Sequence, residues 1–224
     1  MTSRYANKFK RCPNCRINPS LCFCQELVLN DNQTPVVIVM HRAELELTTN
    51  TAYFADKLLK NSVIRVRGFK DEPLDLVNHV DTENYTPLYL FPDEEAKTLD
   101  PSFLDTLEKP PLLIVPDGSW RQAKKMKKRE SFLGGLQSVV LPTGEESSYR
   151  LRTAPAPGAV CTFEAIARAL GVCEGSELQK SLESVFKLIT DRMYYSRAGL
   201  SDLADLPKFL ETKKASNEAS NEKE

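Results

Sequence analysis

The chain has 224 residues, of which 41% are hydrophobic and 27% are charged, and its formal net charge is −1. This composition fits a globular protein and excludes collagen-like chains and proteins that coat nucleic acid by bulk charge. No apolar run approaches the roughly 20 residues of a membrane-spanning helix, and residues 1–8 lack the apolar core of a signal peptide. We therefore expect a cytoplasmic protein with no membrane partner.

Charge is strongly segregated along the chain. Residues 1–16 carry five bases and no acid, whereas residues 71–108 carry eleven acids and a single base, Lys97. Residues 121–129 then carry six bases and no acid. The small net charge is therefore a cancellation, which leaves two basic segments able to contact phosphates.

Four of the six cysteines lie together near the start of the chain, with the spacing Cys12-x2-Cys15-x6-Cys22-x-Cys24. A C-x-x-C pair around a turn presents two sulfurs to one centre, and four thiolates suit tetrahedral Zn²⁺ in a structural site. The alternatives are an iron–sulfur cluster and thiols that are redox-active or unliganded. Cys161 and Cys173 stand in apolar surroundings and are expected to be ordinary buried thiols.

Behind the cysteines, short apolar runs alternate with helical patterns. The predicted strands are 35–40, 63–66, 88–91, 112–115 and 138–141, and the predicted helices are 51–60, 120–129, 163–170 and 178–193. Continuous apolar strands that alternate with helices indicate an α/β fold with a mostly parallel sheet covered by helices on both faces. Sheets of this kind bind ligands at the carboxyl ends of their strands.

One strand–turn–helix segment, residues 112–126, is the most informative part of the sequence. A buried strand ends at Pro116, Gly118 allows a sharp turn, and Ser119 with Gln122 fits a capping box for the next helix. Asp117 stands where such sheets bind ligands and could accept a proton. Because Asp is also a common turn former, a purely structural role is an equal alternative.

The segment that follows the last predicted strand carries further candidates. Arg150 and Arg152 are two positions apart, so in an extended segment they share one side and could contact a carboxylate or phosphates. The alternative is a solvated basic edge. Thr162 is the expected N-cap of the next helix, and Glu164 in its first turn favours the helix dipole.

Together these pieces resemble the DTW-domain family of tRNA-uridine aminocarboxypropyltransferases, which are related to the SPOUT class of RNA-modifying enzymes. The matching pieces are the cysteine cluster and residues 41–44, 49–51, 90–92, 117–123, 148–152 and 161–165, in the order of the family. In the namesake motif Ser119 replaces the usual Thr, which keeps the hydroxyl and the capping ability.

The resemblance implies a SPOUT-like knotted fold and a cytoplasmic enzyme. It would transfer the 3-amino-3-carboxypropyl group of S-adenosylmethionine to N3 of a tRNA uridine and release methylthioadenosine. A uridine of the variable loop is the family's expected target, and neither the residues nor the resemblance specify an oligomeric state.

The resemblance and the chemistry together assign roles to individual residues. Asp117 is the candidate general base, and Arg152 or Arg150 would hold the carboxylate of the donor. The full set of expected donor-binding residues is Phe91, Pro92, Pro116, Asp117, Gly118, Trp120, Leu141, Pro142, Tyr149, Arg150, Thr162 and Glu164. The expected tRNA contacts are Lys8, Lys10, Arg11, Arg16, Arg121, Lys124, Lys125, Lys127 and Lys128, and the acidic segment 71–108 is expected to face away from the tRNA. His41 and Glu44 either line the pocket or form the turn after the first strand.

The expected organisation is a zinc-binding segment at 1–30, a catalytic domain at 31–211 and a disordered tail at 212–224. Two other functions remain open at this stage. A SPOUT-type RNA methyltransferase would share the fold and the cofactor. A non-catalytic zinc-ribbon RNA-binding protein would explain the cysteines and bases but leave the residues around Asp117 without a purpose.

Overall fold

A computed structural model describes residues 11–144, 146–147, 149, 151 and 158–211. The described residues form two compact units: residues 11–26 and 188–211 belong to the first, and those within 27–187 belong to the second. The division at residue 30 stays a prediction, and the predicted tail at 212–224 lies outside the described residues.

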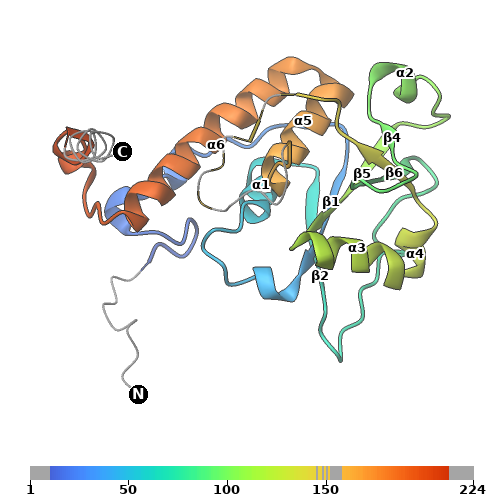
Figure 1. The fold of residues 1–224 in the computed structure, drawn as a ribbon, viewed down its shortest axis with the longest axis horizontal. Helices are drawn as coiled ribbons and strands as arrows, with labels where there is room; N and C mark the ends of the chain where they lie inside the picture. The colour runs from blue at the N-terminus through green and yellow to red at the C-terminus, as the bar shows by residue number, and fades with distance from the viewer. Residues whose placement is uncertain (1–10, 145, 148, 150, 152–157, 212–224) are drawn as a thin grey trace, which may run out of the picture. The chain divides into compact units, whose positions relative to one another are not determined.

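The second unit is built on a parallel sheet of six strands in the order β2-β1-β5-β3-β6-β4 (Figure 1). In chain order the strands are β1 (Val36–His41), β2 (Ser62–Arg67), β3 (Thr86–Leu90), β4 (Lys97–Thr98), β5 (Pro111–Asp117) and β6 (Gln137–Val140). The interior strands β1 and β5 are almost entirely buried because both of their faces are covered. This confirms the predicted α/β class and its parallel sheet.

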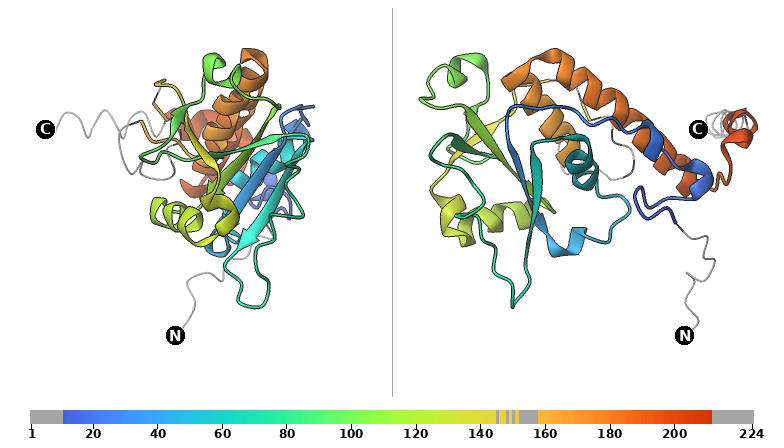
Figure 2. Two further views of the ribbon diagram at one scale, coloured as in Figure 1. Left: turned by 90° about the vertical axis from the view of Figure 1, so that its right-hand side faces the viewer. Right: turned by 180° about the vertical axis from the view of Figure 1, so that it is seen from behind.

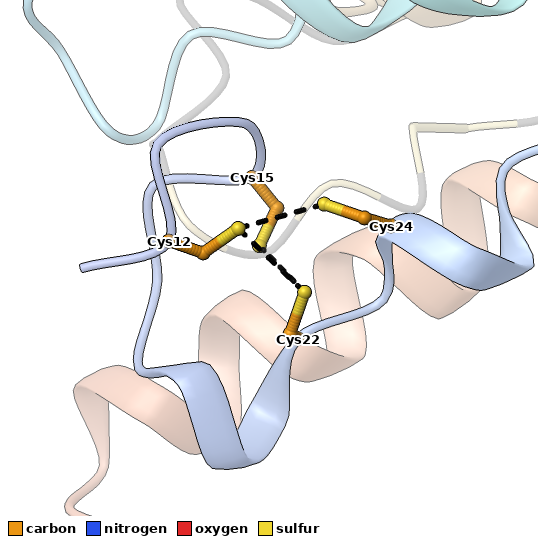
Figure 3. Close-up of side chains that lie close together, drawn as sticks. All are labelled: Cys12, Cys15, Cys22 and Cys24. Carbon is orange, nitrogen blue, oxygen red and sulfur yellow. Dashed lines mark hydrogen bonds between the residues drawn. The ribbon is translucent and has the colours of Figure 1, made fainter.

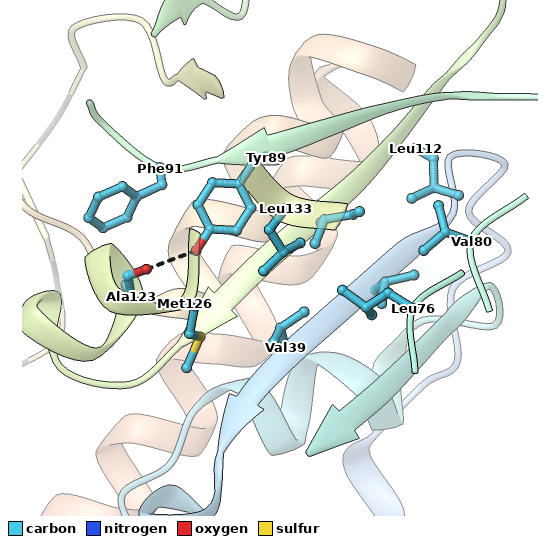
Figure 4. Packing of buried hydrophobic residues seen from close by; sticks show 11 residues of the cluster. Val39, Leu76, Val80, Tyr89, Phe91, Leu112, Ala123, Met126 and Leu133 are labelled. Carbon is cyan, nitrogen blue, oxygen red and sulfur yellow. Dashed lines mark hydrogen bonds between the residues drawn. The ribbon is translucent and has the colours of Figure 1, made fainter. Parts of the chain in front are cut away.

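Helices cover both faces of this sheet, as the two turned views of Figure 2 show. Helices α3 (Trp120–Arg129) and α4 (Ser131–Gly134) lie on one face together with the loop after β2. Figure 4 shows the core beneath them, where Val39, Tyr89, Met126 and Leu133 pack together. Because side chains alternate along a strand, Ile38, Leu88 and their equivalents point to the other face.

The opposite face is covered by α1 (Ala52–Leu58) and α5 (Thr162–Glu174). Helix α6 (Ser176–Arg197) follows, and its Phe186 stacks on Phe163 of α5 with ring centroids 4.6 Å apart. Helix α3 has the predicted bounds, whereas α5 and α6 are each longer than predicted.

Three short elements were not expected from the sequence: β4, α2 (Pro101–Leu104) and α4. A two-residue strand or a single helical turn is too short to produce a hydrophobic period. The Asp100-Pro101 pair is nevertheless a start signal for α2, since the Asp100 carboxylate accepts from the Phe103 amide at 2.8 Å and proline suits the first turn. The SPOUT-like knot stays a prediction.

The described part of the first unit contains the cysteine segment and the end of α6. Its short 3₁₀ helices are η1 (Pro19–Leu21), η2 (Cys24–Glu26) and η4 (Leu203–Asp205). The Asn18 amide donates to the Ser201 carbonyl at 2.9 Å, and Arg192 pairs with Glu26 at 3.5 Å. These contacts join the two parts of the chain that form this unit.

Across the described residues, no helix combines the length and the apolar character needed to cross a bilayer.

Candidate active site and metal centre

The four clustered cysteines converge in the first unit (Figure 3). Their Sγ atoms all lie within 4.8 Å of one another, and the closest pairs are Cys12–Cys24 and Cys15–Cys22, both at 3.6 Å. Tetrahedral zinc with Zn–S bonds of about 2.3 Å requires sulfurs about 3.8 Å apart. The four thiols therefore fit one tetrahedral metal ion.

The backbone of the turn positions Cys12 and Cys15 and lowers the pKa of Cys12. The Arg16 amide donates to the Cys12 carbonyl at 2.8 Å, and Arg16 itself has a positive φ of 63°, which closes a tight turn around the first two cysteines. Backbone hydrogen bonding, chiefly from the Cys15 amide, lowers the pKa of Cys12 to about 6, whereas burial raises the pKa of Cys15 to about 11 and also raises that of Cys24. A thiolate is the form that ligates metal. Since four protein ligands close the coordination shell, the site is of the structural kind.

In the second unit, the turn after β5 sets up the residues around Asp117. The capping box at the start of α3 is present: the Ser119 amide donates to Oε1 of Gln122 at 2.7 Å, and the Gln122 amide donates to Oγ of Ser119. A Cβ at position 118 would lie only 3.0 Å from Oε1 of Gln122, so glycine lets the capping side chain fold back over the turn.

Asp117 is buried, with 4% of its surface exposed, and both of its carboxylate oxygens accept hydrogen bonds. Oδ2 accepts from the side-chain amide (Nδ2) of Asn50 at 2.6 Å, and Oδ1 accepts from the Thr162 hydroxyl at 2.7 Å. The same Asn50 amide lies 3.4 Å from Oε2 of Glu44, which is also buried. The side chains of Asn50 and Thr162 therefore help to orient the Asp117 carboxylate.

Two neighbouring cavities lie at this end of the sheet, and Asp117 lines the second of them. The first, of about 420 Å³, lies at the carboxyl ends of β3, β5 and β6, where parallel sheets bind ligands. Its wall contains most of the predicted donor-binding residues: Phe91, Pro92, Pro116, Gly118, Trp120, Leu141, Pro142 and Thr162. The wall is largely apolar, and Phe91 lies beside Trp120 with ring centroids 5.7 Å apart. An adenosine-sized group suits such a cavity.

The second cavity, of about 490 Å³, has a more polar lining that includes Glu44, Asp117, Arg121, Ser147 and Tyr149. It shares Gly118, Trp120, Ala159, Val160 and Thr162 with the first cavity. Trp120 is 43% exposed, an unusual state for a large aromatic side chain, and it lines both cavities. A ligand that fills both cavities therefore passes Trp120 and Thr162.

One expected cap differs in the structure. Thr162 was expected to be the N-cap of α5, but Cys161 holds that position and Thr162 is the first helical residue. The reason is that the Thr162 hydroxyl is engaged by Asp117, while the Glu164 carboxylate accepts from the Cys161 amide at 3.0 Å. Glu164 also accepts from the Ser147 hydroxyl at 2.6 Å. Glu164 thus holds two residues of the second cavity's wall.

The two residues left open by the sequence divide between the two expected roles. Glu44 lines the second cavity. His41 instead shapes the turn after β1, since its Nδ1 accepts from the Ala43 amide at 3.2 Å and lies 3.1 Å from Nε2 of Gln122. Burial, followed by the charges of Arg67 and Arg42, lowers the pKa of His41. A neutral ring is the form that accepts at Nδ1.

Comparison with known proteins now identifies the family. Residues 9–194 match the DTW domain. The chain belongs to the DTW domain family.

Curated relatives agree with this assignment. tRNA-uridine aminocarboxypropyltransferase A of Arabidopsis thaliana is 30% identical over 233 residues, which cover 89% of this chain and 85% of that protein. tRNA-uridine aminocarboxypropyltransferase 2 of Drosophila melanogaster is 28% identical and covers 79% of this chain and 72% of its own length. The Macaca fascicularis protein of the same name is 28% identical over 75% of this chain, which spans only 58% of that relative. No solved structure significantly matches the chain.

The bases of α3 in this DTW domain fall into two groups. Arg121, Lys124, Lys125, Lys128 and Arg129 are exposed, and the first four lie on the side of the helix away from its buried Ala123 and Met126. Lys127 is mostly covered, and its ammonium group contacts Asp93 at 2.7 Å. The exposed group is free to contact phosphates, whereas Lys127 is committed to a carboxylate of the acidic segment.

Several predicted residues lie outside the described part of the DTW domain: Lys8, Lys10, Arg150 and Arg152. In the first unit Arg11 is exposed and Arg16 partly exposed. Sequence reasoning missed Asn50 and Arg168, which lines the first cavity. Asn50 stands in the Thr-Asn-Thr motif at 49–51, so the motif pointed to it without giving its role.

Cys161 and Cys173 were expected to be ordinary buried thiols, but both residues are partly exposed and Cys161 lines the second cavity. Burial raises the pKa of both, to about 12 for Cys173, so they are uncharged at neutral pH.

Proposed function

We propose that this protein is a tRNA-uridine aminocarboxypropyltransferase that uses S-adenosylmethionine as its donor. The observation that carries the proposal is a pair of adjoining cavities at the strand ends. The buried, hydrogen-bonded Asp117 lines the second cavity, and Gly118, Trp120 and Thr162 connect it to the apolar, adenosine-sized first cavity. Membership in the DTW domain family and the names of the relatives from Arabidopsis and Drosophila support it.

The reaction we infer joins N3 of a uridine to the γ-carbon of the donor's methionine moiety. The bond between that carbon and the sulfonium sulfur breaks, its electron pair stays on sulfur, and neutral methylthioadenosine leaves. The proton of N3 passes to a base, for which Asp117 is the candidate. Transfer of this group in place of the methyl group is a matter of orientation, because both are bonded to the same activated sulfur.

The two cavities suit the two halves of this donor. The adenosine would occupy the first cavity, against Phe91, Pro116 and Leu141, and the aminocarboxypropyl chain would extend past Thr162 into the polar second cavity. Arg150 or Arg152 would hold the donor carboxylate, as proposed from the sequence. The exposed Trp120 would stack on the target base or on the adenine.

We also propose that Cys12, Cys15, Cys22 and Cys24 hold a structural Zn²⁺, which stabilises the first unit and supplies no chemistry to the transfer. The tRNA would be bound by the exposed bases of α3 together with the bases of residues 8–16. A SPOUT-like knot and a cytoplasmic location belong to the same proposal.

The by-product of the reaction tests this function against its nearest alternative. The protein is incubated with S-adenosylmethionine and unmodified tRNA, and the small molecules are separated by chromatography. Aminocarboxypropyl transfer releases methylthioadenosine, whereas a methyltransferase releases S-adenosylhomocysteine. Calorimetry with S-adenosylmethionine alone distinguishes both enzymes from an RNA-binding protein without a donor site.

A further inference from the structure

Lys127 differs from the other lysines of α3 in where its charge is placed. Its Nζ atom lies 2.7 Å from Oδ2 of Asp93 and 2.5 Å from Oγ of Ser138. The Ser138 hydroxyl also donates to the same Asp93 oxygen at 2.5 Å. The three groups thus form a closed ring, in which Ser138 is 1% exposed and the Lys127 and Asp93 side chains are 20% and 24% exposed. We name this ring the Lys127 clamp.

The clamp joins three elements that each supply wall to the first cavity. Asp93 directly follows Phe91 and Pro92, Ser138 directly precedes Val139 and Val140, and Ala123 lies one helical turn before Lys127 on α3. Helix α3 is tied to β3 at a second point, where the Tyr89 hydroxyl donates to the Ala123 carbonyl at 3.1 Å (Figure 4). The clamp therefore fixes the relative positions of three parts of one cavity wall.

The wall at Phe91 and Pro92 depends on such anchors because it is not part of a strand. On one side the Phe91 amide donates to the Val139 carbonyl at 3.0 Å. On the other side the segment is held by Asp93, whose second oxygen accepts from the Glu95 amide at 3.1 Å. Partly burying a lysine and a carboxylate has a desolvation cost, so an apolar pair would serve stability equally well. What the ion pair adds is a fixed geometry.

We propose that Lys127 is a positioning residue for the donor-binding cavity and not a contact of the tRNA. Through Asp93 and Ser138 it holds Phe91 and Pro92 against β6, at the separation that the adenosine group of the donor requires. This inference rests on the proposed function, because that function supplies the donor. It also divides α3 by role, with phosphate contacts on its exposed side and the clamp on its covered side.

The test compares Lys127→Met with two matched variants of the full-length protein. Arg67→Met breaks an ion pair of similar length and burial, Arg67–Glu130 at 2.6 Å with 16% and 25% exposure, which joins β2 to the C-cap of α3. Lys128→Met removes a neighbouring exposed lysine. The Kd for S-adenosylmethionine is measured by calorimetry, and the Kd for tRNA is measured at several salt concentrations.

We expect Lys127→Met to raise the Kd for S-adenosylmethionine about tenfold, equal to about 1.4 kcal/mol, with no change in the salt dependence of tRNA binding. Lys128→Met should reduce the salt dependence of tRNA binding and leave the Kd for S-adenosylmethionine unchanged. Arg67→Met should change neither of these two quantities. Asp93→Asn should reproduce the effect of Lys127→Met on the donor, and the two substitutions combined should cost less than the sum of their separate effects.

Three results would overturn the clamp: unchanged donor binding in Lys127→Met, an equal loss in Arg67→Met, or a salt slope reduced as in Lys128→Met. Failure of the wild-type protein to bind S-adenosylmethionine would instead contradict the proposed function. The clamp is then judged without any ligand, by amide hydrogen exchange of residues 91–96. Exchange there must accelerate in Lys127→Met and not in Arg67→Met, and unchanged exchange would overturn the inference.

Discussion

The cysteine cluster and the site at Asp117 gather their side chains in opposite ways. The outermost cysteines are 12 positions apart in the chain. Asp117, in contrast, is hydrogen-bonded to Asn50, which lies 67 positions before it, and to Thr162, which lies 45 positions after it. A few backbone turns bring the thiols together. The carboxylate meets Asn50 and Thr162 only after β1, β5, α1 and α5 have been placed beside one another.

This difference has a physical consequence for each site. Ile17, Leu21 and Phe23 are buried in the segment that carries the thiols, and we expect a bound metal to add much of the remaining stabilisation of that segment. The Asp117 site needs no metal, because the packed sheet and the helices on its two faces hold each member of the network. Loss of the metal should therefore reduce the stability of the cysteine segment, whereas loss of the Asp117 carboxylate should reduce turnover.

The largest effect is expected from removal of a cysteine ligand. Cys22→Ser removes one of the four thiolates and should therefore lose the bound metal. The stabilisation lost with the metal is large, since structural zinc contributes about 10–16 kcal/mol in small zinc-binding peptides. Metal content by mass spectrometry and amide exchange of residues 11–26 measure the result. Cys173→Ser, outside the cluster, is the control and should keep its metal. One full equivalent of zinc in Cys22→Ser would contradict the four-thiolate site.

The next largest effect is expected at Asp117. Asp117→Asn keeps the shape of the side chain and removes the proton acceptor, so we expect turnover to fall by about 100- to 10,000-fold. Binding of S-adenosylmethionine and the temperature of thermal unfolding should change little, since the hydrogen-bonding side chains of Asn50 and Thr162 and the two cavities remain. Asp75→Asn, at an exposed carboxylate, serves as the control. Near-normal turnover in Asp117→Asn would remove this residue from the mechanism.

A smaller effect is expected from the exposed side of α3. Replacing Lys124, Lys125 and Lys128 with Ala should weaken tRNA binding and lower the slope of log K against log salt by about 2 to 3, because each phosphate contact contributes about 0.7–0.9. Filter binding across a salt series measures the slope. Alanine at three exposed lysines elsewhere, Lys60, Lys70 and Lys109, removes the same charge. An equal change in that control would show that the effect is one of net charge and not of α3.

The smallest effect is expected from the pH dependence of the Lys127 clamp. Although burial acts to raise the pKa of Asp93, the hydrogen bonds from Lys127 and Ser138 outweigh it and hold this pKa below its usual 3.8. A lowered folded-state pKa means that the stabilisation is present above the unfolded value and is lost as the pH falls through the folded value.

The wild-type protein should therefore lose stability below about pH 4 more steeply than Asp93→Asn. Urea unfolding at pH 5 and at pH 3 measures the difference, with Glu94→Gln as a neighbouring exposed control. Parallel losses in wild type and Asp93→Asn would show that the ion pair contributes nothing to folding.

Sequence reasoning reached the parts of the molecule that depend on local chemistry. The cysteine spacing predicted the four-thiol cluster, and the capping pattern at Ser119 predicted the start of α3. Apolar runs predicted the parallel strands β1, β2, β3, β5 and β6, because strands buried on both faces carry a strong signal. Most of the predicted donor-binding residues likewise lie in the wall of the first cavity.

What the sequence did not reveal depends on contacts between distant segments. The charge run at 121–129 made Lys127 look like its neighbours, and only the placement of Asp93 beside α3 separates them. The partnership of Asp117 with Asn50 and Thr162 is hidden for the same reason, since each residue alone fits a turn or a cap. The short β4 and α4 carry too few residues for any period to appear.

The most direct test of the proposed function is mass spectrometry of the nucleosides of tRNA after incubation with the protein and S-adenosylmethionine. The wild-type protein should convert a uridine into one that carries the aminocarboxypropyl group on N3, and Asp117→Asn should leave the same tRNA essentially unmodified. A methylated nucleoside, or unmodified tRNA after incubation with wild-type protein that binds both substrates, would contradict the assignment.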